Sequence, residues 1–158
     1  MTSTLDKPPA LTGEPATPRR PLFTATLYLL RGVATVHALL AMIQPVSIGQ
    51  YLDGRYGLLR VHQITAGLLI LAGMALGLVA IGYVLAGGPV KAIGGVLLFL
   101  AEGIQTGLGY GRELGAHVPL GVAIVALALV IAVWSWTRAA GRPRPRRPRS
   151  VLMPGEAA

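Results

Sequence analysis

Long apolar runs without charged side chains dominate the middle of the chain. Residues 61–90 and 114–137 contain no Asp, Glu, Lys or Arg. Each run exceeds the roughly 20 apolar residues that an α-helix needs to cross a bilayer. Two further apolar stretches carry one charge each, Arg31 in the first and Glu102 in the third. The pattern predicts four transmembrane helices, at residues 22–44, 61–85, 89–110 and 117–137.

Short connections between the later helices make consecutive helices antiparallel. An up-down-up-down four-helix bundle is the simplest all-α fold that results. The second and third helices contain the GxxxG pairs Gly73/Gly77 and Gly103/Gly107. Small residues at this spacing favour close packing between membrane helices.

Both ends of the chain differ from this apolar middle. Nine of the 12 prolines lie in residues 1–21 and 143–154. Residues 1–21 are polar and have no early apolar core, so a cleavable signal peptide is not expected there. The sequence therefore predicts disordered tails at 1–21 and 138–158 around a transmembrane domain at 22–137.

The basic residues indicate how the chain is oriented. Of the 14 Lys and Arg, ten lie in the two tails and the second connection, three lie in the other two connections, and Arg31 lies inside a span. This bias predicts cytoplasmic termini, with the loops at 45–60 and 111–116 on the outer side. The Arg-rich C-terminal tail is expected to attract anionic lipid. It has no interleaved aromatic residues, so nucleic acid is not an expected partner.

Composition narrows the class of protein. Charged residues make up 13% of the chain, against about 25% in soluble domains, which argues against a soluble enzyme. The chain has no cysteine, which excludes thiolate metal sites and covalent c-type haem. Arg outnumbers Lys, and Ala, Gly and Pro are abundant, which is typical of proteins encoded by a high-GC bacterial genome. We therefore expect the protein in a bacterial plasma membrane. No catalytic motif was found.

Charged side chains inside a membrane span need partners. Counted from Leu22 and Pro89 at about 1.5 Å per residue, Arg31 and Glu102 lie at similar depths, roughly 14 and 20 Å. An ion pair between them is expected to hold the first helix to the third. His37 and Gln105 share a level by the same count, and a hydrogen bond there would add to this contact. A proton path, or a site for an anionic ligand, is the functional alternative.

Two other histidines open helices on the outer side. His62 begins the second helix and His117 begins the fourth. These helices are diagonal in the predicted bundle, so their inward side chains face a shared interior. Two neutral imidazoles in this arrangement can supply both axial ligands of a haem. The alternative is that each histidine only lies at the polar interface.

A weak internal repeat relates the two histidines. Residues 44–67 and 105–121 each begin with Gln, continue through Gly and a loop with an acidic residue, Gly and Arg, and then reach Leu, His and Gly. Parallel repeats of this kind place equivalent residues about an axis along the membrane normal. The repeat therefore predicts that His62 and His117 are equivalent.

Two segments carry a resemblance to a known family. VHQITAGLLIL and QTGLGYGRELGAHVPLGVAIVALAL resemble one four-helix half of haem A synthase. In that family, the corresponding histidines are haem ligands, which implies this role for His62 and His117. The family has two such halves and a first-helix glutamate motif, whereas this chain has one half and carries His37 and Gln44 in that region. The whole chain also resembles small four-helix membrane proteins of actinobacteria.

The leading hypothesis is a b-type haem protein, either an electron carrier or an accessory subunit of a respiratory or other membrane protein. Haem b is expected between the helices near the outer face, with Arg55, Arg60 and Arg112 as candidates for its propionates and His37 as a reserve ligand or hydrogen-bond donor. A cofactor-free structural protein is the first alternative. A small transporter or proton-conducting subunit that uses Arg31, His37 and Glu102 is the second.

Overall fold

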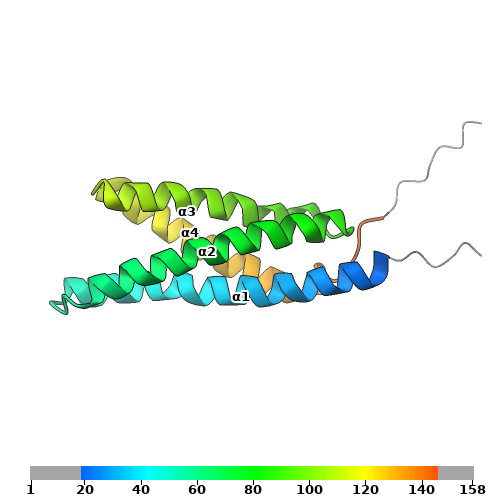
Figure 1. Ribbon diagram of the computed structural model, residues 1–158, viewed down its shortest axis with the longest axis horizontal. Coiled ribbons are helices and arrows are strands. Elements are labelled where there is room, and N and C mark those ends of the chain that lie inside the picture. The colour runs from blue at the N-terminus through cyan, green and yellow to red at the C-terminus, as the bar shows by residue number, and fades with distance from the viewer. Residues whose placement is uncertain (1–18, 146–158) are drawn as a thin grey trace, which may run out of the picture.

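The computed structural model describes residues 19–145, and this part of the chain is entirely helical. It contains four α-helices and no strand (Figure 1). The elements are α1 (Arg19–Leu52), α2 (Leu58–Leu85), the short 3-10 helix η1 (Val90–Ile93), α3 (Gly94–Tyr110) and α4 (Leu114–Trp136). The predicted all-α fold is confirmed for these residues. Residues 1–18 and 146–158, which include most of both predicted tails, lie outside the described residues.

The helices run up and down in sequence order and surround one interior. α1 packs against α2 and α4, and α3 packs against the same two helices. α1 and α3 are therefore diagonal, as are α2 and α4. We call the end with the α1–α2 and α3–α4 connections (residues 53–57 and 111–113) the loop end. The opposite end, with the α2–α3 connection and residues 137–145, is the terminal end. The α1–α2 and α3–α4 hairpins diverge toward the loop end (Figure 1).

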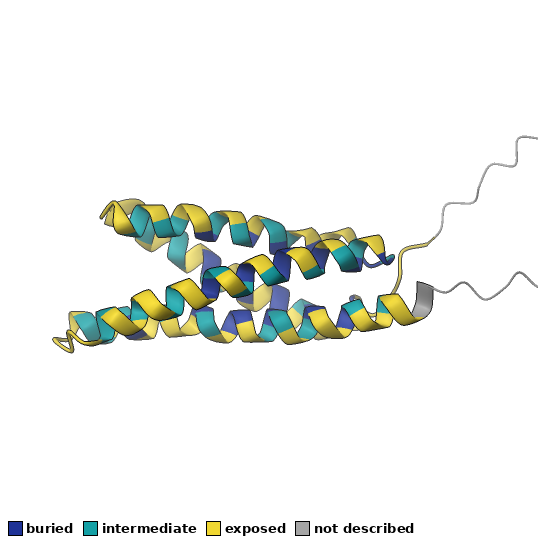
Figure 2. Ribbon diagram, viewed as in Figure 1, coloured by how far each residue is buried: buried dark blue, intermediate teal, exposed yellow. Residues whose placement is uncertain are grey.

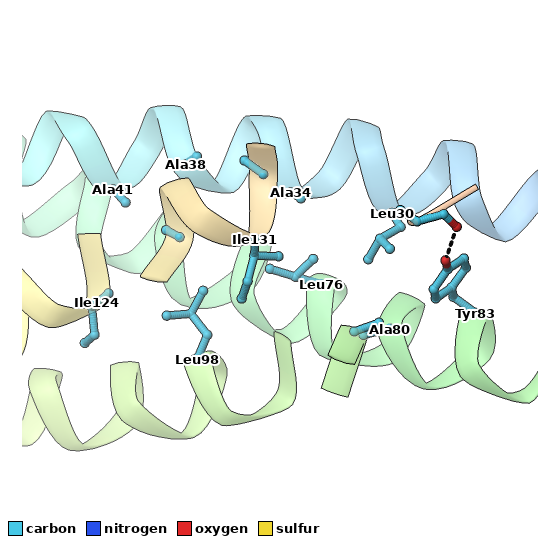
Figure 3. Packing of buried hydrophobic residues seen from close by; sticks show 14 of the residues in the cluster. Leu30, Ala34, Ala38, Ala41, Leu76, Ala80, Tyr83, Leu98, Ile124 and Ile131 are labelled. Carbon is cyan, nitrogen blue, oxygen red and sulfur yellow. Dashed lines mark hydrogen bonds between the residues drawn. The ribbon is translucent and has the colours of Figure 1, made fainter. Parts of the chain in front are cut away.

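The hydrophobic core fills the half of the bundle nearer the terminal end. Leu30, Leu76 and Leu98 are completely buried there, and Ile131 packs with them (Figure 3). Alanines on α1 bring the backbones close, because their side chains occupy little space. Apolar burial of this kind is the main stabilising term of such a core.

The half of the bundle nearer the loop end lacks such a core. α2 has no buried residue before Leu69, α3 has none after Glu102, and α4 has none before Ile124. Figure 2 shows the same difference, with buried residues gathered toward the middle and the terminal end. Side chains from the two hairpins therefore do not fill the space between them at the loop end.

The outer surface of the bundle is apolar on every helix. Leu39, Leu78, Leu97 and Val133 are all more than half exposed, one on each helix. Four segments are long and apolar enough to cross a membrane, namely Pro21–Leu52, Leu58–Leu85, Val90–Tyr110 and Leu114–Trp136. An apolar exterior on helices of this length is what a bilayer stabilises, and it supports a multi-pass membrane protein.

The first helix is longer than predicted, whereas the other three agree closely with the sequence pattern. α1 continues through Pro45 to Leu52, where the prediction ended it at residue 44. Proline removes one backbone donor, but membrane helices tolerate it when nearby groups compensate. The hydroxyl of Ser47 donates to the Gln44 carbonyl at 3.0 Å beside this proline.

Part of the predicted C-terminal tail is packed against the bundle. The hydroxyl of Tyr83 donates to the carbonyl of Ala140 at 2.5 Å, and both residues are fully buried (Figure 3). Arg144 donates from its backbone N–H to Gly87 at 2.8 Å and from its guanidinium to the Val84 carbonyl at 2.6 Å. Residues 138–145 therefore cover the end of α2, although the sequence pattern placed them in a disordered tail.

Candidate functional site

A cavity of about 330 Å³ lies between the four helices in the half of the bundle nearer the loop end. All four helices line it. Its wall is mainly apolar, with residues such as Ile48, Leu69 and Ile124. The wall has eight polar side chains, which belong to Gln44, His62, Gln63, Glu102, Gln105, Thr106, Tyr110 and His117. A mostly apolar cavity with a few convergent polar groups is the usual form of a ligand site.

His62 contributes one imidazole to this cavity from the first turns of α2. Its Nδ1 lies 3.3 Å from the Gln44 carbonyl and 3.3 Å from the Ser47 hydroxyl, both on α1. A ring N–H at Nδ1 that donates to the carbonyl fixes the tautomer with the lone pair on Nε2. No hydrogen bond of Nε2 is found among residues 19–145.

His117 contributes the second imidazole from the first turn of α4. Its Nδ1 lies 2.9 Å from the Gln105 carbonyl on α3. The ring packs against Gly109, where a Cβ would lie 2.9 Å from the imidazole Cε1 and would push the ring away. The glycine therefore leaves room for the ring beside α3.

The two histidines are held in the same way. Each Nδ1 contacts the main-chain carbonyl of a glutamine on the preceding helix, Gln44 for His62 and Gln105 for His117. The sequence repeat aligned these same two glutamines and these same two histidines. Histidines that bind metals usually donate their other ring N–H to a carbonyl or carboxylate, which orients the ring. The arrangement therefore suits two axial ligands whose Nε2 atoms are available.

Glu102 does not pair with Arg31, which corrects the expected contact between α1 and α3. The Glu102 carboxylate is bonded through Oε1 to Nε2 of His37, and both side chains are buried. This bond crosses the diagonal of the bundle. A polar contact does join α1 to α3 as expected, but the residue of α1 that makes it is His37 and not Arg31.

Arg31 is directed toward the terminal end. Its Nε donates to the Ser135 carbonyl at 3.0 Å, and its guanidinium lies over the rings of Tyr28 at 5.3 Å and Trp136 at 5.1 Å. Long basic side chains extend toward the nearest polar region in this way, and aromatic faces stabilise the cation. The depth count did not include this extension, which takes the charge away from the carboxylate.

The remaining predicted site residues do not line the cavity. His37 is completely buried beneath it, with Nε2 bonded to Glu102. Arg55, Arg60 and Arg112 are exposed around the loop end, and Arg55 donates to the Gln50 side chain at 3.0 Å. These three arginines lie at the same end of the bundle as the cavity but are not part of its wall.

Sequence reasoning missed the function of one glycine. Gly73 was interpreted as a helix-packing residue of a GxxxG pair. In the structure a Cβ at this position would overlap Oε2 of Glu102, so the glycine makes space for the carboxyl group. The sequence contains only a weak signal for this contact, namely a glycine and an intramembrane glutamate on neighbouring helices.

Known proteins provide no independent guide to this site. Comparison with protein-family models, curated proteins and solved structures gave no match. Within residues 19–145 no group of three or more His, Asp or Glu side chains could hold a metal ion. A haem iron needs only two axial ligands from the protein, so His62 and His117 fit that group by number, tautomer and shared cavity.

Proposed function

We propose that the protein binds haem b in the cavity at the loop end, with His62 and His117 as the axial ligands. The observation that carries the proposal is the matched pair of contacts from Nδ1 to the carbonyls of Gln44 and Gln105. These contacts orient both rings and leave both Nε2 atoms to bind iron. The bound group would supply one-electron redox chemistry, and the protein would serve as an electron carrier or accessory subunit.

The unfilled half of the bundle supports the proposal. A four-helix bundle normally fills its interior with side chains, because empty volume forfeits packing energy. Here α2 has no buried residue before Leu69, α3 has none after Glu102 and α4 has none before Ile124. A flat apolar group of haem size would contact the apolar wall and bury the side chains that line it.

The proposal includes an orientation in the membrane. We infer a bacterial plasma membrane from the excess of Arg over Lys and the abundant Ala, Gly and Pro. We infer cytoplasmic termini and an outer loop end from the excess of Lys and Arg in the tails and the second connection. Propionates at the loop end would then meet Arg55, Arg60 or Arg112 in the outer connections. Anionic lipid on the cytoplasmic side would contact the basic C-terminal tail.

The test is to purify the full chain after expression with haem supplied, and to record oxidised and reduced absorption spectra. A six-coordinate low-spin signal that is lost in both His62→Ala and His117→Ala supports the proposal. Ile64→Ala is the matched control, because Ile64 lies two residues after His62 on the exposed face of α2, does not line the cavity and should leave the spectrum unchanged. A folded, colourless protein would exclude haem.

A cofactor-free structural protein is the second candidate. The observation in its favour is the complete core in the half nearer the terminal end, where Leu30, Leu76 and Leu98 are fully buried. This half gives the bundle stability that needs no ligand. The colourless outcome of the same experiment would place this candidate first. The proton-conducting alternative has less support, because this core separates His37 and Glu102 from the terminal end.

A further inference from the structure

The buried pair His37–Glu102 lies where it can exchange a proton with the cavity. The pair joins α1 to α3, and its side chains are 0% and 3% exposed. Glu102 also forms part of the cavity wall, whereas His37 does not. Two atoms of the pair, His37 Nδ1 and Glu102 Oε2, are buried and have no hydrogen-bond partner among the described residues. Buried polar atoms without partners are rare and call for a functional explanation.

Counting protons gives two states for the pair. One proton between Nε2 and Oε1 makes the bond and leaves the pair with a net charge of −1. A second proton, on Oε2, makes the pair neutral, as a carboxylic acid beside a neutral imidazole. Oε2 has no partner and belongs to the residue that lines the cavity, so Oε2 is the atom that gains or loses the proton.

The surroundings leave the charge of the pair uncompensated. Glu102 is the only Asp, Glu, Lys or Arg of the cavity wall, and the other titratable groups there are His62 on α2, Tyr110 on α3 and His117 on α4. On α2, Gly73 lies against Oε2 and supplies no side chain. Arg31, the nearest basic residue along α1, is bonded to Ser135 on α4. A charge that appears in the cavity should therefore act strongly on this pair, since among the described residues no Lys or Arg lines the cavity wall.

In the part of the chain that the structure describes, the cavity connects the pair to the loop end. The cavity wall extends from Leu114 at the loop end to Glu102. On the other side, the buried cluster that includes Leu30, Leu76, Leu98 and Ile131 fills the interior (Figure 3). The geometry therefore provides for proton exchange with the loop end and offers no path through the bundle.

We propose that His37–Glu102 is a proton-binding site linked to the redox state of the cavity, an inference that rests on the proposed haem function. The pair takes one proton from water at the loop end for each electron that a one-electron donor delivers to the cavity. It releases that proton when the electron leaves. An added electron removes one positive charge near Glu102, which favours the neutral, doubly protonated pair. Linkage requires the reverse effect as well, so protonation of the pair raises the affinity for the electron.

The experiment is a spectroelectrochemical titration of the haem-loaded full chain at several pH values. Full linkage makes the midpoint potential fall by about 59 mV per pH unit, which is one tenfold change in equilibrium constant for one electron. Glu102→Gln should remove this slope, because the amide cannot bind the proton. Glu113→Gln is the matched control, since it makes the same change in an exposed glutamate at the loop end and should retain the slope.

The outcomes separate this inference from the proposed function. A haem spectrum with a potential that does not depend on pH, or an equal slope in Glu102→Gln, overturns the proton site and leaves haem binding intact. A colourless wild-type protein overturns both. If Glu102→Gln does not fold, His37→Gln tests the same pair. A neutral amide beside the carboxyl must shift the pH range over which the midpoint potential depends on pH. An unchanged range in that variant also overturns the proton site.

Discussion

The carboxyl group of Glu102 can lie inside the bundle because α2 has a glycine opposite it. Oε2 occupies the position that a side chain at Gly73 would take. Oε1 is bonded to His37, so the carboxylate has a partner on α1 and space on α2. Burial of a carboxylate is costly unless such a partner is present. The glycine and the histidine together therefore account for a charge at this depth.

Gly73→Ala should destabilise the protein. The added Cβ would overlap Oε2, so the carboxyl must move and weaken its bond to His37. Overpacking of this kind typically costs about 1–3 kcal/mol, which thermal unfolding in detergent would detect. Gly103→Ala is the control, because no atom lies within 4 Å of a Cβ there, and its unfolding temperature should not fall. Equal stability of the two variants would show that the glycine is not needed for Glu102.

At the scale of single residues, the sequence predicted which histidines share the interior better than it predicted their contacts. His62 and His117 were predicted from their positions on diagonal helices, and the structure places both on one cavity. The partner of Glu102 was predicted incorrectly, because Arg31 and His37 both lay within reach by helix rise. The choice depended on the direction of a long side chain, and spacing along a helix does not determine that.

The polar bond between α1 and α3 is a contact between elements that otherwise do not pack against each other. These helices are diagonal, and α2 and α4 lie between them. His37 and Glu102 meet in the interior, where the dielectric is low and a hydrogen bond is strong. The pair therefore adds a polar link between the two hairpins to the packing of α2 on α3 and of α1 on α4.

A double-mutant cycle would measure this link. His37→Phe or Glu102→Met alone leaves a buried polar group without its partner, which costs about 3–5 kcal/mol when one member of a buried pair is removed. The double variant should cost much less than the sum of the two, as measured by unfolding in detergent.

The control cycle combines Arg31→Met with Glu102→Met. Arg31 is bonded to Ser135, so these two changes should add within about 0.5 kcal/mol. Additive effects for His37 and Glu102, with coupling for Arg31 and Glu102 instead, would contradict the contacts described above.

The elements themselves followed from the sequence to within a few residues, except for α1. Apolar length determines a membrane helix, and charged residues or loop signals mark its ends. Pro45 looked like such an end, but α1 continues to Leu52. A proline inside an apolar run of this length does not by itself end a membrane helix, so its position in the sequence does not determine where α1 stops.

The whole molecule has two halves that differ in how they are filled. The half nearer the terminal end has a complete side-chain core, and residues 138–145 cover it. The half nearer the loop end contains the cavity, both candidate ligands and the proton-binding pair at its floor. The sequence did not predict this division, because its apolar periodicity is similar throughout. The division depends on which residues face the interior. Buried Ala and Leu fill the half nearer the terminal end, whereas Gly67, Gly109 and Gly121 are part of the cavity wall.

The proposed orientation places this second half on the outer side of the membrane, and it has a direct test. A topology reporter fused after Ala158 should be cytoplasmic, and a reporter inserted at Gly54 should be external. The reason is the positive-inside bias, with ten Lys and Arg assigned to the terminal side and three to the loop side.

An insertion at Gly111 serves as the second external position, because it lies in the α3–α4 connection at the same end as Gly54. Agreement between the two insertions would exclude an artefact of one loop. An external reporter at Ala158 with internal reporters at both loops would reverse the orientation. In that case His37–Glu102 would exchange protons with the cytoplasm, and any haem would lie on the cytoplasmic side of the core.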